Sequence, residues 1–200
     1  MTRYDGEFFR RWLVLTAAAV EREAGRLTEL DSAIGDADHG VNLRRGFAAV
    51  TAVLDKEAPD TPGAVLTLAG RQLISTVGGA SGPLYGTLLR RTGKELGVEA
   101  TVGRERLAAA LGAGVAAVAQ LGGAQAGDKT MLDALLPAVE GLGESFAAAR
   151  DAAAQGALAT VPLQARKGRA SYLGERSIGH EDPGAASSAL LIAALAEAAA

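Results

Sequence analysis

The sequence predicts an all-α fold, with about eight helices packed as one antiparallel bundle or barrel. Apolar residues recur at spacings of three and four, the spacing of one helix face, as in Phe9, Leu13, Ala17 and Val20. The alternating pattern of half-buried strands is scarce, and aromatic residues, which favour strands, make up only 4% of the chain. Alanine is abundant instead, and it favours helices that pack closely together.

The same spacing places the helices along the chain. The first helix carries the pattern that starts at Phe9, and Pro62 suits the first turn of a later helix. Because neither an internal repeat nor an interdomain linker interrupts the series, we expect residues 1–200 to form a single domain. The further helices are expected over Asn42–Lys56, Val65–Val77, Leu84–Leu96, Leu107–Val118, Met131–Glu140, Glu144–Ala154 and Gly184–Ala199.

Composition narrows the class of protein. A chain of 200 residues, 48% of them hydrophobic, can bury a substantial core, and a net charge of −3 argues against a nucleic-acid-binding surface. No stretch approaches the roughly 20 apolar residues of a membrane span, and the N-terminus lacks the apolar core of a signal peptide. The chain has no cysteine, which fits a reducing compartment. We therefore expect a cytoplasmic protein that binds neither nucleic acid nor membrane.

The most informative segment is Leu30–Phe47, which we interpret as an acidic loop leading into a helix. Asp31, Asp36 and Asp38 lie within eight positions of one another. Carboxylates so close repel one another unless a cation or a row of hydrogen-bond donors offsets their charge. Carboxylate oxygens suit Mg²⁺ or Ca²⁺, and Mg²⁺ usually binds together with a phosphate. The segment therefore indicates metal-bound phosphate chemistry.

The carboxylates also fit other interpretations. An aspartate before a helix is often only an N-cap, and Gly-Asp pairs mark turns. An EF-hand is excluded by spacing, because Phe47 or Asn42 would stand where the bidentate glutamate belongs. Zinc is disfavoured since the chain has no cysteine and only two histidines, His39 and His180. Magnesium remains the best fit.

A glycine-rich break, Gly78–Pro83, separates two predicted helices. Small residues let backbone N–H groups approach phosphate oxygens, and the N-terminus of the next helix adds positive potential. The same residues would also serve a tight helix connection with a glycine cap. Ser81 offers a hydroxyl either to a phosphate or to the backbone, and both alternatives stay open.

A second break, Gly122–Thr130, nearly matches a P-loop. The match fails because Asp128 stands between the second glycine and the lysine, and because a helix rather than a strand precedes it. Any nucleotide site here is therefore of another type. On these residues alone, we interpret Asp128 and Lys129 as solvated residues of a helix's first turn.

The longest break, Gly168–Pro183, carries Arg169, Arg176, His180 and Asp182. Loops longer than about 12 to 15 residues are uncommon inside compact domains and are usually functional or disordered. An arginine offers a bidentate fork to phosphate, so this segment could close over a ligand. The alternative is a solvated surface loop.

Together these segments resemble the ADP-binding subunit of dihydroxyacetone kinase, the DhaL or DAK2 domain family. The resemblance extends from about residue 8 to residue 198. It implies an eight-helix antiparallel barrel with a nucleotide, ADP or ATP, and two Mg²⁺ ions bound at one end. The matching segments read LDSAIGDADHGVNLRRGF, VGGASGPLYGT, GDKTMLDALLP and ARKGRASYLGERSIGHEDPGA.

The resemblance also assigns roles to individual residues. It gives the metal ions to Asp31, Asp36 and Asp38, and it places Met131 against the adenine face. It does not lead us to name a catalytic base, because phosphoryl transfer depends mainly on positioning and charge neutralisation. The nucleotide contacts that it implies are His39, Gly40, Val41, Asn42, Ala80, Ser81, Gly122, Met131, Arg169, Asp182, Pro183 and Gly184.

The implied reaction is the phosphorylation of dihydroxyacetone held on a separate DhaK-type subunit. In one branch of the family, bound ADP is rephosphorylated in place by a phosphohistidine carrier of DhaM type that is supplied by phosphoenolpyruvate. In the other branch, ATP exchanges as a substrate. The first branch is our leading prediction and the second the alternative. A nucleotide-dependent partner of a transcription regulator, or a kinase for another carbonyl compound such as a ketotetrose, would use the same site.

Overall fold

Several helices begin at side chains that accept hydrogen bonds from their first turn. The structure, a computed structural model, describes residues 2–200. Helix α1 (Gly6–Ile34) begins after Asp5, whose carboxylate accepts from the Phe8 N–H at 3.0 Å. Helix α3 (Pro62–Thr76) is capped by Thr61, α7 (Phe146–Ala159) by Ser145, and α8 (Pro183–Ala198) by Asp182. Such caps satisfy N–H groups that have no partner within the helix.

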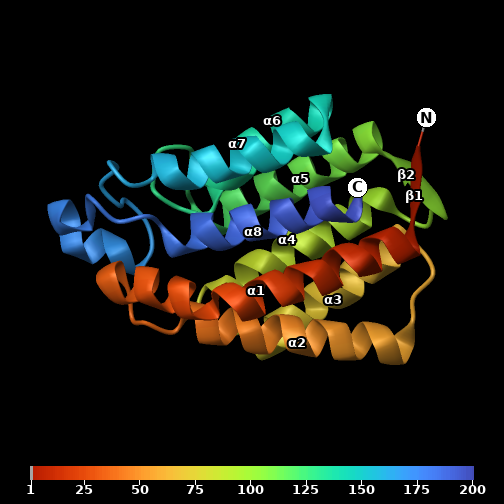
Figure 1. Ribbon diagram of the computed structural model, residues 1–200, viewed down its shortest axis with the longest axis horizontal. Coiled ribbons are helices and arrows are strands. Elements are labelled where there is room, and N and C mark those ends of the chain that lie inside the picture. The colour runs from red at the N-terminus through yellow and green to blue at the C-terminus, as the bar shows by residue number, and fades with distance from the viewer. Residues whose placement is uncertain (1) are drawn as a thin grey trace.

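The other four helices have no side-chain N-cap. They are α2 (His39–Glu57), α4 (Ser81–Leu96), α5 (Arg104–Gly122) and α6 (Leu132–Glu144). Three of these, α2, α4 and α6, begin at the same end of the molecule as α8 (Figure 1). Their first N–H groups therefore point towards that end without a side chain of their own cap residue to satisfy them.

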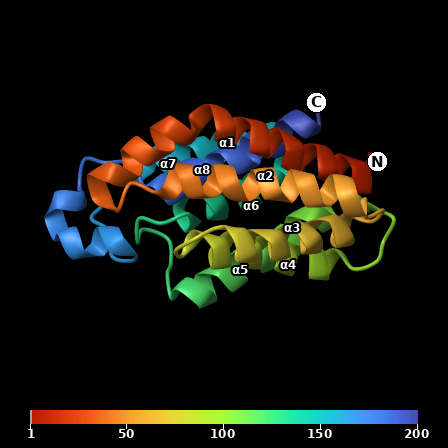
Figure 2. The ribbon, with the colours of Figure 1, turned by 90° about the horizontal axis from the view of Figure 1, so that it is seen from below.

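The helices pack in the order of the chain. Each α-helix contacts the next one along the sequence, and α8 returns to contact α1. Two three-residue strands, β1 (Arg3–Asp5) and β2 (Thr101–Gly103), pair antiparallel near the N-terminus. Both chain termini lie at this end, and the segment before α8 projects from the opposite end in both views (Figures 1 and 2). The two ends of the molecule are thus built differently.

The core is apolar and closely packed. Phe9, Trp12, Leu43 and Phe47 are all buried, and the Trp12 Nε1–H donates to the Leu191 carbonyl at 2.8 Å. Helices α3 and α4 approach through glycines: a methyl group added at Gly70 of α3 would lie 2.6 Å from the Gly86 carbonyl oxygen of α4. An alanine there would force the helices apart. Small residues therefore set the interhelix spacing, as the alanine-rich composition predicts.

The all-α, single-domain prediction is confirmed. Within residues 2–200 there are eight α-helices and one 3₁₀ helix, η1 (Arg169–Ser177). Helix α1 continues to Ile34, so the prediction that Asp31 lies in a loop is wrong, and the acidic loop is confined to residues 35–38. The segment 168–183, predicted as a loop, contains η1, and α7 runs to Ala159 rather than Ala154. No helix of the described chain is sufficiently long and apolar to cross a membrane.

Candidate nucleotide and metal site

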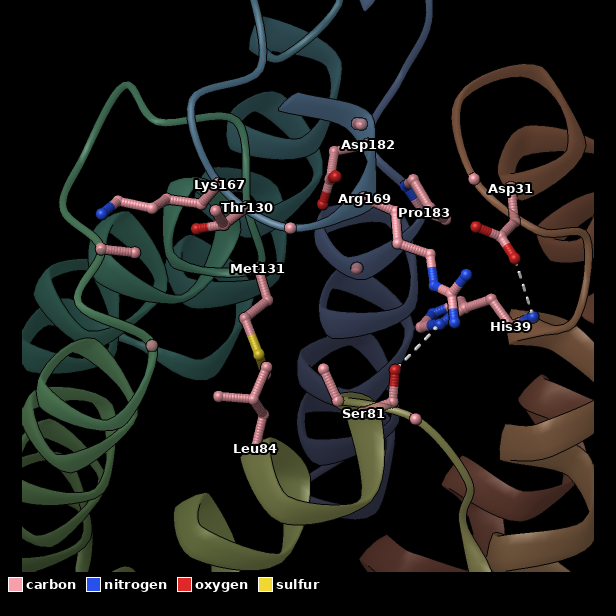
Figure 3. A pocket seen from close by; sticks show the side chains of 18 of the residues that line it. Asp31, His39, Ser81, Leu84, Thr130, Met131, Lys167, Arg169, Asp182 and Pro183 are labelled. Atoms are coloured by element: carbon pink, nitrogen blue, oxygen red, sulfur yellow. Dashed lines mark hydrogen bonds between the residues drawn. The ribbon is translucent and has the colours of Figure 1, made fainter. Parts of the chain in front are cut away.

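A cavity of about 450 Å³ opens at the end of the molecule where α2, α4, α6 and α8 begin. The loops before these helices supply its walls, so segments far apart in the sequence meet there (Figure 3). Most of the predicted site residues line this cavity. They are Asp31, Asp36, Asp38, His39, Ala80, Ser81, Gly122, Met131, Arg169, Asp182, Pro183 and Gly184.

Three predicted nucleotide contacts do not line the cavity. Gly40, Val41 and Asn42 lie in the first turn of α2, directly after His39. Gly40 is packed so tightly against the Ala24 carbonyl of α1 that a side chain would clash with it. Asn42 accepts a hydrogen bond from the Arg45 guanidinium at 2.9 Å, and Val41 is exposed. The structure therefore does not place these three side chains in the wall of this cavity.

The three carboxylates of the acidic segment converge on one wall of the cavity. Asp31, Asp36 and Asp38 each offer an oxygen, and these oxygens all lie within 4.8 Å of one another. Ala37 between them has a φ of +61°, a left-handed conformation that costs an alanine energy. The strained turn brings Asp36 and Asp38 to the same place as the helical Asp31. Hard oxygen ligands at this spacing fit a divalent cation such as Mg²⁺.

The hydrogen bonds of this wall show which of the three carboxylates acts as a helix cap. Asp31 Oδ2 accepts from the N–H groups of Asp38 at 2.9 Å and of His39 at 3.1 Å, so it caps the start of α2 from another helix. Asp38 occupies the N-cap position but makes no side-chain cap bond. The N-cap interpretation therefore describes Asp31 in part and fails for Asp38. Asp38 makes no cap bond, and Asp36 Oδ2 is paired with the Arg169 guanidinium.

Arg169 reaches this wall from the segment 168–183, which could close over a ligand according to its sequence. Its Nη2 lies 3.0 Å from Asp36 Oδ2, although the arginine side chain is 69% exposed. An ion pair this exposed adds about 0–1 kcal/mol to stability. Its importance is one of position, since it places a guanidinium beside the carboxylates and over the cavity (Figure 3).

The glycine-rich turn before α4 forms the second wall. Gly79 has a φ of +66°, which a glycine adopts without strain, and the turn ends at Ser81, the first residue of α4. The N-terminus of α4 has no side-chain cap and borders the cavity with the N-termini of α2 and α6, where Asp31 and Thr130 already accept some of the first N–H groups. Three helix N-termini directed at one cavity make a favourable environment for an anion such as phosphate.

Behind this wall, His39 belongs to a buried hydrogen-bond chain. Its Nδ1 lies 3.2 Å from Ser81 Oγ and its Nε2 lies 2.8 Å from Ser187 Oγ, which in turn bonds the Tyr85 hydroxyl at 2.6 Å. Burial lowers the pKa of His39, although the neighbouring carboxylates act in the opposite direction. Burial raises the pKa of Tyr85 to about 12. These hydrogen bonds fix the imidazole of His39 and orient the Ser81 hydroxyl. Tyr85 and Ser187 were not predicted as site residues from the sequence.

The third wall is apolar with one buried acid. Met131 and Leu84 point towards one another across the cavity (Figure 3), where they offer a surface for a flat ring. Asp182 caps α8 by accepting from the Ala185 N–H at 2.8 Å. Burial raises the pKa of Asp182 to about 7. A polar group close to an apolar wall is typical of a pocket that binds a heterocyclic base.

The prediction that Asp128 and Lys129 are solvated is wrong. Asp128 is 5% exposed and accepts from the Gln125 N–H at 2.9 Å, and Lys129 is 1% exposed. The Lys129 ammonium donates to backbone carbonyls rather than to water. Lys129 looks solvated in the sequence, because its carbonyl partners lie more than thirty residues away and leave no local pattern.

Comparison with known proteins adds to this geometry. Residues 33–197 match the DAK2 domain. The chain is 44% identical to the Listeria innocua PEP-dependent dihydroxyacetone kinase 2, ADP-binding subunit DhaL, over 96% of this chain and 94% of that protein. It is 43% identical to the Escherichia coli PEP-dependent dihydroxyacetone kinase, ADP-binding subunit DhaL, over 94% of each. It is 36% identical to the L-erythrulose 1-kinase of Mycolicibacterium smegmatis, over 88% of this chain and 32% of that protein.

Among solved structures, the chain resembles the dihydroxyacetone kinase from C. freundii in complex with AMP-PNP and Mg²⁺. The TM-score is 0.76 and the sequences are 27% identical. The match covers 98% of this chain and 35% of that one. The likeness therefore concerns one part of a longer kinase chain.

Proposed function

The chain belongs to the DAK2 domain family, and we propose that it is the nucleotide-binding subunit of a dihydroxyacetone kinase. The observation that carries this proposal is the cavity itself. Three carboxylates suited to Mg²⁺ lie beside three helix N-termini suited to phosphate. Relatives that match nearly the whole chain are named as ADP-binding subunits of that kinase.

Within the cavity, we assign the carboxylates of Asp31, Asp36 and Asp38 to two Mg²⁺ ions. Bound Mg²⁺ would neutralise the phosphate oxygens and favour transfer of the terminal phosphoryl group. The Gly78–Ser81 turn would donate N–H groups to the phosphates, and Met131 would pack against the base. Arg169 would add a guanidinium to the phosphate side, where it reaches Asp36. None of these residues needs to act as a catalytic base.

We propose that residues 1–200 are a single nucleotide-binding domain whose eight α-helices close into a barrel. The cyclic order of helix contacts, from α1 through α8 and back to α1, supports this closure. The even-numbered helices then begin around one rim, which explains why a single cavity collects four helix starts.

The names of the relatives support one phosphoryl donor over the other. Subunits named PEP-dependent or PTS-dependent share 39% to 44% identity with this chain. We therefore propose that ADP stays bound, is rephosphorylated by a phosphohistidine carrier, and passes its phosphoryl group to dihydroxyacetone on a DhaK-type subunit. Direct use of ATP is the alternative, supported by the likeness to a kinase solved with an ATP analogue. Either donor implies a cytoplasmic reaction.

The acceptor has a second candidate, because the chain is also 36% and 38% identical to two erythrulose kinases. The acceptor would be held on another polypeptide or domain, so this cavity does not distinguish the two ketones. A transfer assay distinguishes them: the purified chain is combined with a DhaK-type subunit, and dihydroxyacetone and erythrulose are supplied in parallel.

The same assay tests the donor. Phosphoenolpyruvate with its carrier proteins is compared with ATP, and the ketose phosphate is quantified. We expect dihydroxyacetone phosphate with the phosphoenolpyruvate system and little with ATP alone. Product from ATP without the carrier would select the alternative donor. No ketose phosphate from either donor, with Mg²⁺ and the partner subunit present, would contradict the kinase function.

A further inference from the structure

Lys129 lies in a cage of backbone carbonyl oxygens. Its Nζ donates to the carbonyls of Thr160 at 2.9 Å, Leu163 at 3.0 Å and Ser177 at 2.8 Å. The carbonyls of Val161 and His180 complete the cage. An ammonium group has three N–H bonds, so five oxygens exceed what directional donors satisfy. The arrangement resembles the coordination of a monovalent cation by carbonyl dipoles.

The charge of this lysine has no carboxylate partner within 4.0 Å among the ion pairs of residues 2–200. A buried charge is tolerated only when polar groups surround it. Lys129 also has a φ of +63°, a left-handed conformation that costs a lysine energy. The carbonyl cage, together with the negative charge of the nearby Asp182, offsets the cost of burying this ammonium.

All five carbonyls belong to one segment, residues 160–180, which runs from the end of α7 through η1 towards α8. This segment carries Arg169 and leads directly to Asp182. Its own apolar anchoring is slight, because only Ala165 and Ala170 are buried with Ile34 of α1. The Lys129 ammonium thus joins the beginning and the end of the segment that covers the cavity, alongside the bonds from the Gly179 N–H to the Val161 carbonyl and from the Ala165 N–H to the Ser177 hydroxyl.

We propose that Lys129 is a positioning residue whose ammonium, as an internal cation, holds residues 160–180 so that Arg169 and Asp182 face the nucleotide. The inference rests on the proposed function, because it takes the cavity to bind a magnesium–nucleotide complex. Lys129 itself touches neither phosphate nor metal in this account. It acts through the backbone of the segment that it ties together.

The test uses the affinity of the protein for ADP with Mg²⁺ in buffers that differ in their monovalent cation. Lys129→Ala opens the cage, and we expect at least a tenfold weaker affinity in choline chloride. Ammonium or potassium ions, which fit a carbonyl cage, restore much of that affinity. Lys129→Met fills the cage without charge, so we expect a similar loss that no cation reverses. Lys56→Met, an exposed lysine on α2, is the control and leaves affinity unchanged.

A double-mutant cycle distinguishes positioning from general destabilisation. If Lys129 acts by placing Arg169, then Arg169→Ala weakens binding less in the Lys129→Met protein than in the wild type. Additive losses would contradict the inference. Lys129→Met also covers the case in which Lys129→Ala does not fold, since loss of affinity in the folded methionine variant supports the proposal.

Besides additive losses in the cycle, three results would overturn the inference. They are wild-type affinity in Lys129→Met, wild-type affinity of Lys129→Ala in choline chloride, and an affinity of Lys129→Ala that is equally weak in choline and in ammonium. These results leave the proposed function intact as long as the wild type binds ADP with Mg²⁺. A wild-type protein that binds no nucleotide under any of these conditions would overturn the proposed function and the inference together.

Discussion

Two oxygen clusters at the same end of this molecule differ in where their counter-charge comes from. Around Lys129, five carbonyl oxygens surround an ammonium that belongs to the chain. Around Asp31, Asp36 and Asp38, three carboxylates converge, and the side chain that reaches them is the largely exposed Arg169. The first cluster is buried and satisfied from within, whereas the second faces the cavity with its negative charges close together.

This difference in the source of the counter-charge suits the two clusters to different tasks. A lysine side chain is covalently attached, so the charge that it supplies cannot leave and suits a permanent structural tie. Carboxylates that face a cavity suit a cation that arrives with a ligand, because their mutual repulsion is relieved only when the charge is bound. In the proposed function, the carbonyl cluster orders the segment over the cavity, and the carboxylate cluster binds the cation that enters with the nucleotide.

The largest expected effect comes from removing one charged group of the carboxylate cluster. In Asp38→Asn, or equally in Asp36→Asn, one charged ligand of the cation is lost, so we expect the Kd for ADP in the presence of Mg²⁺ to rise roughly 10- to 100-fold, about 1.4–2.7 kcal/mol. Calorimetric titration measures the change. Asp55→Asn removes an exposed carboxylate from the other end of α2 and is the matched control. Equal affinity for ADP with Mg²⁺ in the wild type and in Asp38→Asn would show that Asp38 does not bind the cation.

A second effect, of similar size, concerns the buried acid Asp182. The pKa of Asp182 is about 7 in the folded protein against 3.8 in its ordinary state, because burial penalises the carboxylate. Between these values the folded protein binds more protons than the unfolded chain, so its stability falls as pH rises through this range. Asp182→Asn retains an acceptor for the Ala185 N–H and removes this decline.

Urea denaturation without nucleotide or Mg²⁺ measures this effect. Between about pH 5 and about pH 8, we expect Asp182→Asn to gain roughly 1–3 kcal/mol over the wild type in the free energy of unfolding, on a scale of about 1.4 kcal/mol per pKa unit. Asp55→Asn again serves as the control. Parallel pH profiles of wild type and Asp182→Asn would show that the carboxyl of Asp182 titrates normally.

The smallest expected effect concerns Arg169, the link between the clusters. Its ion pair with Asp36 is largely exposed, so we expect Arg169→Ala to leave the free energy of unfolding within about 0.5 kcal/mol of wild type. Binding of ADP with Mg²⁺ should weaken by about 3- to 10-fold, because a guanidinium leaves the phosphate side. Arg176→Ala, an exposed arginine beyond the kink at Gly174 in η1, is the control. Unchanged binding and phosphoryl transfer would make Arg169 an ordinary solvated arginine.

The sequence predicted the helices well, because burial on one face leaves a periodic pattern. It also predicted that Asp31, Asp36 and Asp38 act together, because three carboxylates within a short stretch are visible in the chain. It missed the two short strands, since three residues are too few to alternate, and it missed η1, whose only buried residues are Ala170 and Ser177.

The missed parts of the cavity have a common cause. Lys129 is held by backbone carbonyls, which every residue possesses, so no side-chain type in the sequence predicts the cage. Tyr85 and Ser187 act through His39 from two different helices, and their spacing in sequence is set by the fold rather than by local pattern. Contacts between distant segments made from common groups become visible only in three dimensions.

The most direct test of the account is the nucleotide content of the purified protein, with and without prior EDTA treatment. Denaturation releases bound nucleotide, and chromatography quantifies it. We predict close to one ADP per chain after purification and its loss after EDTA, because the carboxylate cluster holds the nucleotide through Mg²⁺. A protein that binds neither ADP nor ATP when Mg²⁺ is supplied would contradict the account.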